Sequence, residues 1–197
     1  MLEVLNHQRR ILGFLTIEEL LETNNTVYDP FSTLISRSIT LGQGNIFYPS
    51  VVLQSLEQGN ISIGHNNTFT PNCFFYASGK IVIGNQNLFG DGGVTARVNA
   101  GEVLTFGNYG RYINTPAFTG NNSLGDGSQV IGPIRVQSCV LGAGGDFAHS
   151  EADKRGAVLK GYGLARGLHL QRGQVIDGRG TFDINDMKFQ SFFHPKK

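Results

Sequence analysis

The sequence of 197 residues is short of charge and close to neutral. Asp, Glu, Lys and Arg make up 16% of it, well below the usual quarter, and the formal net charge is +1. Such a chain lacks the basic excess that draws proteins to nucleic acids or anionic membranes, so neither partner is expected. No apolar run approaches the roughly 20 residues that span a membrane.

Cysteine, tryptophan and proline are also scarce. Two cysteines, Cys73 and Cys139, make no disulfide framework and no zinc-site pattern. The N-terminus mixes acids and bases with apolar residues and has no small-residue cleavage site, so we expect no signal peptide and a cytoplasmic protein with reduced thiols. Only 6 prolines accompany 27 glycines, and no Gly-X-Y period is present, which excludes collagen and Pro/Gly-rich disorder.

What the sequence does contain is a repeated nine-residue block. Three segments align without gaps as an apolar residue, Gly, two polar residues, Asn, any residue and Phe; they are LGQGNIFYP from Leu41, IGHNNTFTP from Ile63 and IGNQNLFGD from Ile83. Further apolar–Gly pairs follow at Phe106–Gly107, Leu124–Gly125, Leu141–Gly142 and Tyr162–Gly163. Counted from Gly42, the glycines of these pairs follow one another at somewhat irregular intervals of about 20 residues.

This repeat length, about 20 residues with short β-type segments, predicts an all-β parallel β-solenoid, because stacked coils bury the faces that one coil leaves open. We expect one apolar column, made of Leu41, Ile63 and Ile83. We also expect one polar ladder at a corner, made of Asn45, Asn67 and Asn87. The repeat glycines would allow a positive φ or a close approach of backbones. An antiparallel meander is disfavoured because hairpins predict alternation, not a phase-locked block.

The two ends differ from the repeats. Residues 16–23 start with a Thr cap, with Glu at the third helical position, and predict one short helix within a cap segment, residues 1–27, that closes the solenoid. The solenoid is expected over residues 28–180. Residues 181–197 lose the glycines and are expected to form an arm along the outside or on a neighbouring subunit. A lone solenoid would leave its aromatic residues exposed: Phe182, Phe189, Phe192 and Phe193.

The repeats resemble the bacterial hexapeptide-repeat family over roughly residues 27–180. This resemblance implies a left-handed parallel β-helix, a homotrimer with sites between subunits, and acyl transfer from acyl-CoA. The stretch GAVLKGYGLARGLHLQRGQVIDGRG, residues 156–180, is similar to the closing coils of such transferases, but Arg179–Gly180 replaces their usual Pro-Ala and weakens the inference of coenzyme A binding. The segments IGHNNTFTPNC and IGNQNLFGDG also resemble the non-enzymatic β-helical subunits of the dynactin pointed-end complex. The His-x-x-x-x-His spacing of γ-class carbonic anhydrases is absent, and no metal is predicted.

Two histidines are candidate general bases for acyl transfer, since His serves this role in the family. His65 occupies a repeat position where Gln43 and Asn85 stand in the neighbouring coils, which also fits a plain polar turn residue. His149 lies in GGDFAHSEADKRGA, the most charged and least regular segment, which also fits a solvated loop. His169 follows one repeat length later and is expected one coil above His149, but two ligands alone make a weak metal site.

Basic residues accumulate in the C-terminal coils. They could bind a phosphate, including the phosphates of coenzyme A, and a role in solubility is the alternative; they are Lys154, Arg155, Lys160, Arg166, Arg172 and Arg179. Lys160, Arg166 and Arg172 are the candidates for binding coenzyme A. Two functions therefore stay open. The chain is an acyltransferase that moves an acetyl or longer acyl group from acyl-CoA to a sugar or amine acceptor, or it is a non-catalytic structural or binding module on the same scaffold.

Overall fold

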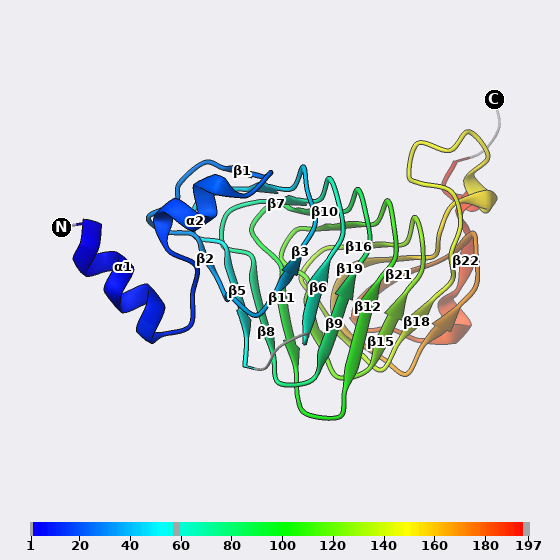
Figure 1. Ribbon diagram of the computed structural model, residues 1–197. Helices are drawn as coiled ribbons and strands as arrows, with labels where there is room; N and C mark the ends of the chain where they lie inside the picture. The colour runs from blue at the N-terminus through cyan, green and yellow to red at the C-terminus, as the bar shows by residue number, and fades with distance from the viewer. Residues whose placement is uncertain (1, 57–59, 195–197) are drawn as a thin grey trace.

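The computed structural model describes residues 2–56 and 60–194 and shows a parallel β-solenoid of about seven turns (Figure 1). Its strands form three faces. The first face contains β1 (Thr26–Val27), β4 (Ile46–Phe47), β7 (Thr68–Phe69), β10 (Leu88–Gly90), β13 (Arg111–Ile113) and β16 (Gln129–Ile131). The second contains β2 (Leu34–Ile35), β5 (Val52–Ser55), β8 (Phe74–Ala77), β11 (Thr95–Val98), β14 (Ala117–Thr119) and β17 (Ile134–Gln137).

The third face is a separate sheet that closes the coil. It contains β3 (Thr40–Leu41), β6 (Ile61–Ile63), β9 (Lys80–Ile83), β12 (Val103–Phe106), β15 (Asn122–Leu124), β18 (Val140–Leu141) and β20 (His169–Leu170). The long strand β19 (Val158–Arg166) pairs with both β16 and β17 and so joins the first two faces. The last coil strand, β21 (Gln174–Thr181), pairs with β19 in parallel.

The predicted apolar column is confirmed. Leu41 pairs with Ile63, and Ile63 pairs with Ile83. The column continues through Phe106, Leu124, Leu141 and Leu170. The assignment of Tyr162–Gly163 to this series is wrong, because Tyr162 lies on β19 and is 54% exposed. The spacing of the glycines pointed to Tyr162 because the connection between β18 and β19 carries a long insertion, residues 142–157, called the β18–β19 loop below.

The predicted polar ladder is also confirmed. The backbone N and Nδ2 of Asn67 donate to Oδ1 of Asn45 at 2.9 and 3.0 Å, and Asn87 repeats the same two bonds to Asn67. Each Nδ2 also donates to the carbonyl of a repeat glycine, as Asn67 does to Gly84 at 2.9 Å. All three amides are buried, so the ladder satisfies polar groups that would otherwise be costly inside the corner.

The repeat glycines allow close backbone approach. A Cβ at Gly64 would lie 2.6 Å from the carbonyl oxygen of Gly84 in the next coil, although Gly64 has no positive φ. Inside the first face, aromatic rings stack along the axis: the Phe47 and Phe69 centroids are 5.1 Å apart, and those of Phe69 and Phe89 are 4.8 Å apart. The rings of this stack belong to the buried core.

The N-terminal end carries two helices where one was predicted. The predicted helix is α2 (Ile17–Glu22), capped by Thr16 with a full capping box, and its Leu20 is completely buried in the end of the core. The additional helix, α1 (Leu2–Ile11), projects beyond the solenoid (Figure 1). It is held by polar contacts: the Arg9 guanidinium donates to four backbone carbonyls, including that of Thr33 at 2.9 Å. Among the described residues no helix is long and apolar enough to cross a membrane.

The C-terminal arm packs along the outside of its own last coil, which is the first of the two predicted placements. It contains η2 (Ile184–Asp186), β22 (Lys188–Phe189) and η3 (Gln190–Phe192), and β22 pairs antiparallel with β21. Phe182 is 5% exposed, so its expected exposure is wrong; the Cβ-free Gly178 leaves room for its ring. The other three phenylalanines of the arm remain at least a third exposed: Phe189, Phe192 and Phe193.

Candidate ligand-binding pocket

A cavity of about 350 Å³ opens on the outer surface of the first face, over the last coils. Its floor follows from the parallel register, which places Arg111 beside Gln129, Gln129 beside Val158, and Val158 beside Val175 on successive strands. A second column on the same strands adds Ile131 and Lys160. Side chains that are distant in sequence, such as Arg111 and Val175, thus line one cavity because the coils stack.

The β18–β19 loop forms one wall of the cavity. Phe147 of this loop packs its ring on the Arg111 guanidinium, with 5.2 Å between the guanidinium carbon and the ring centroid. Nε of Arg155 donates to the His149 carbonyl at 2.8 Å, which ties the two halves of the loop together. A bridge between Gly145 and Arg155 fixes the base of the loop.

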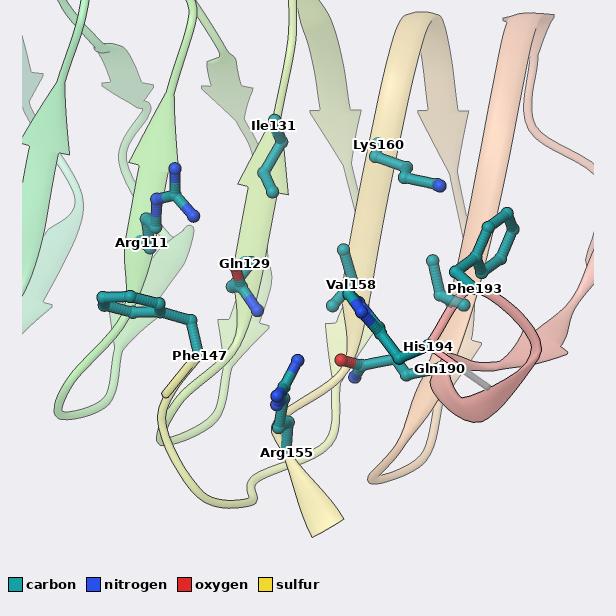
Figure 2. A pocket seen from close by; sticks show the side chains of 11 residues that line it. Arg111, Gln129, Ile131, Phe147, Arg155, Val158, Lys160, Gln190, Phe193 and His194 are labelled. Carbon is teal, nitrogen blue, oxygen red and sulfur yellow. The ribbon is translucent and has the colours of Figure 1, made fainter. Parts of the chain in front are cut away.

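The C-terminal arm forms the opposite wall (Figure 2). Nζ of Lys160 lies 3.4 Å from the centroid of the Phe193 ring and 3.3 Å from Oδ2 of Asp177. Buried Gln190 donates through Nε2 to the Gly156 carbonyl at 2.8 Å, so the arm is fastened to the end of the loop. His194 follows η3 and also lines the cavity.

The cavity is cationic. Arg111, Arg155 and Lys160 line it, and its lining contains no Asp or Glu among the described residues. Lys160 is paired with Asp177, whereas neither arginine has a carboxylate within ion-pair distance among residues 2–56 and 60–194. A cation that is partly removed from water and lacks a counter-ion is unfavourable, so this arrangement favours occupation by an anion.

The three predicted phosphate-binding residues are not brought together. Lys160 lies in the cavity, as described. Arg166 lies on the second face, where Nε and Nη2 donate to Oε1 of Gln137 at 3.0 and 2.8 Å. Arg172 is exposed in the turn between β20 and β21. Their role toward coenzyme A stays a prediction, and Lys160 is the member of the set that the pocket contains.

The two predicted general bases lie on different elements. His65 is exposed at a coil corner. Its ring Nδ1 accepts the backbone N–H of Gln43 at 3.0 Å, and the backbone N–H of His65 donates to Oδ1 of Asn85 at 2.7 Å. His149 lies in the β18–β19 loop, with Nδ1 3.2 Å from the backbone N of Glu151. Neither ring lines the cavity, and their role as general bases stays a prediction.

Metal and thiol chemistry find no support around these residues. The expected stacking of His169 on His149 is wrong, because His169 pairs with Val140 on the third face. No group of three His, Cys, Asp or Glu suited to a metal ion occurs in the part of the chain that the structure describes. Cys73 and Cys139 are buried, and burial raises the pKa of Cys73 to about 12, so it is held as a thiol.

Sequence reasoning missed most of the cavity. The register pairs Arg111 with Gln129 in the next coil, but no motif in the sequence marks either residue as part of a site. Arg155 belongs to the charged segment around His149 and to the basic residues of the C-terminal part of the chain that could bind a phosphate, and it lines the cavity. His194 and Phe193 reach the cavity only through the path of the arm.

Comparisons with known protein families, curated proteins and solved structures find no significant match. The parallel β-solenoid therefore rests on the structure itself, and the resemblance to the hexapeptide-repeat family stays a prediction.

Proposed function

We propose that this β-solenoid is a non-catalytic binding module that holds a small anionic molecule in the cavity between the β18–β19 loop and the C-terminal arm. The observation that carries the proposal is the pair of guanidinium groups, Arg111 and Arg155, that face one cavity without a carboxylate partner among the described residues. Guanidinium groups present a planar fork of N–H donors that suits phosphate and carboxylate oxygens.

A neutral donor supports the same proposal. Gln129 lies on the cavity floor between the two arginines, is only 5% exposed, and has no side-chain hydrogen-bond partner within the described ranges. The amide still reaches solvent through the cavity, because it is not among the buried polar atoms without a partner in the described ranges, and its N–H can donate to an anion bound there. The volume also lies within the range of small-molecule sites.

The test compares the melting temperature of the protein in phosphate and in chloride at equal ionic strength. We expect inorganic phosphate to raise the melting temperature of the wild type, because a ligand that binds only the folded state stabilises it. The double variant Arg111→Ala/Arg155→Ala should lose this response. The matched control is Arg135→Ala/Arg97→Ala, which removes two exposed arginines of the second face. An equal phosphate response in both double variants would contradict the proposal.

Acyl transfer from acyl-CoA to a sugar or amine acceptor is the second candidate, and Lys160 favours it, since this predicted phosphate-binding residue does line the cavity. The test is acetyl-CoA in the same thermal assay, followed by an acyl-transfer assay. His149→Ala and His65→Ala should abolish transfer and leave the oligomeric state unchanged. If acetyl-CoA neither shifts the melting temperature nor reacts, this candidate is rejected and the binding module remains.

A cytoplasmic location belongs to the proposal as well. It is supported by the two free, buried cysteines, since reduced thiols are typical of that compartment.

A further inference from the structure

The walls of the cavity carry more apolar surface than an inorganic anion would use. Phe147 and Phe193 are 51% and 37% exposed, and they approach from two different segments of the chain. The floor between them adds the half-buried side chain of Ile131, whereas Val158 and Val175 beside it are almost fully buried. Figure 2 shows Gln129 and Arg155 between Phe147 on one side and His194 on the other. Covering this apolar surface with a ligand would be favourable in proportion to the area removed from water.

The charge of the cavity limits the anionic group. Asp177 already neutralises Lys160, whereas Arg111 and Arg155 have no such partner among the described residues. Two uncompensated positive charges match a dianion. A phosphate monoester carries about −1.5 to −2 at pH 7, and a simple carboxylate carries a single charge.

We infer that the ligand is a phosphate monoester of a compound with one flat aromatic ring. The phosphate group lies toward Arg111, Arg155 and the Gln129 amide, and the ring covers apolar surface that Phe147 and Phe193 contribute. The volume of about 350 Å³, at the lower end for small-molecule sites, suits one ring and its phosphate. This inference rests on the proposed anion-binding function and specifies its ligand.

The alternative is that the two cation–ring pairs only hold the loop and the arm in place. Both rings do pack on cations, Phe147 on Arg111 and Phe193 on Lys160, and such contacts stabilise a structure without any ligand. In that case the rings would contribute nothing to the choice of ligand. Affinities for ligands with and without a ring therefore separate the two explanations.

The experiment uses three probes in isothermal titration calorimetry with the full chain at pH 7 and constant ionic strength. Phenyl phosphate has both the ring and the dianion, inorganic phosphate lacks the ring, and benzoate has the ring with a single charge. We expect phenyl phosphate to bind at least about tenfold more tightly than either of the others. The ranking in the wild type does not depend on the folding of any variant.

Each outcome bears on a different part of the inference. Equal affinity for phenyl phosphate and inorganic phosphate would contradict the inference that the ligand carries an aromatic ring. Equal affinity for phenyl phosphate and benzoate would contradict the inference that the anionic group of the ligand is a dianion. In both cases anion binding itself would stand. If none of the three probes binds, the proposed function fails with the inference.

Two variants test whether the aromatic rings of the cavity walls cause the preference for phenyl phosphate over inorganic phosphate. Phe147→Leu and Phe193→Leu keep an apolar side chain but remove the flat ring, and each should reduce the preference for phenyl phosphate over inorganic phosphate at least about threefold. Phe31→Leu is the matched control, since Phe31 is 64% exposed before β2 at the opposite end of the solenoid. A preference that is unchanged in both wall variants would contradict the role of these rings.

Discussion

Asn67 illustrates how one residue maintains the stacking of the coils. Its side chain makes four hydrogen bonds: Nδ2 donates to Asn45 and Gly84, and Oδ1 accepts two N–H groups of Asn87. Because the residue is fully buried, no water can replace these bonds when the amide is removed.

We therefore expect Asn67→Ala to lower the free energy of unfolding by about 3 kcal/mol, measured by urea denaturation, because buried partners are left unsatisfied. Asn99→Ala is the control, since Asn99 is exposed and its side chain makes no hydrogen bond within the described ranges; it should change stability by less than about 0.5 kcal/mol. A loss below about 1 kcal/mol for Asn67→Ala would show that the ladder does not stabilise the coils.

The two cysteines give a second prediction at the residue scale. Burial raises the pKa of Cys73 to about 12 and also raises that of Cys139. Since the thiolate is the reactive form, neither residue should react with a thiol-specific disulfide reagent at pH 8 in the native protein, and both should react after denaturation. Rapid labelling of the native protein would disprove the burial of these thiols.

Among the elements, α2 is joined to the first coil by an ion pair between Glu19 and Arg37. Glu19 accepts hydrogen bonds from the Arg37 guanidinium at 2.6 and 2.5 Å, and these bonds are the main cause that lowers the pKa of Glu19 from 4.5 to about 2. A carboxyl group whose pKa is lower in the folded state stabilises the fold above its unfolded pKa. This contribution is lost as the pH falls from about 4.5 to about 2.

We expect the melting temperature of the Glu19→Gln variant to change less between pH 5 and pH 3 than the melting temperature of the wild type. The cost at pH 7 should stay below about 1 kcal/mol, because both side chains are at least a third exposed. Glu22→Gln, at the exposed end of the same helix, serves as control and should keep the wild-type pH dependence. Identical pH profiles for Glu19→Gln and the wild type would contradict this account.

The elements that local signals define were predictable from the sequence. The capping box around Thr16 predicts α2, and the phase-locked block from Leu41 predicts the columns and the ladder, because each signal lies within a short stretch of the chain. Helix α1 was not predictable in this way. Its Asn6 and Arg9 face the protein while its leucines are exposed, which is the reverse of the pattern that identifies a surface helix.

The pocket depends on two irregular segments, and this explains why its residues were missed. Because of the β18–β19 loop, the last position of the apolar column is Leu170 and not Tyr162. The repeat period therefore does not predict which residues stack in this region. The arm then turns back antiparallel to β21 and brings His194 to the cavity. Neither path follows from the repeat. Two of the basic residues expected in the C-terminal coils, Arg155 and Lys160, do line the cavity, and their role in binding phosphate stays a prediction.

For the whole molecule, the homotrimer with parallel solenoid axes remains a proposal. It is supported by the resemblance to the hexapeptide-repeat family and by the exposed aromatic rings of the arm, Phe189, Phe192 and Phe193. Light scattering coupled to size exclusion should give three times the 21.4 kDa mass of one chain. A mass of 21.4 kDa at micromolar concentration would refute the trimer.

The central claim is that the cavity between the β18–β19 loop and the arm binds a phosphate monoester. A crystal structure of the protein soaked with phenyl phosphate tests it most directly. We predict density for the phosphate within hydrogen-bond distance of Arg111 and Arg155, with the phenyl ring against Phe147 or Phe193. Phenyl phosphate bound elsewhere, with only water in an open cavity between the two arginines, would contradict the claim.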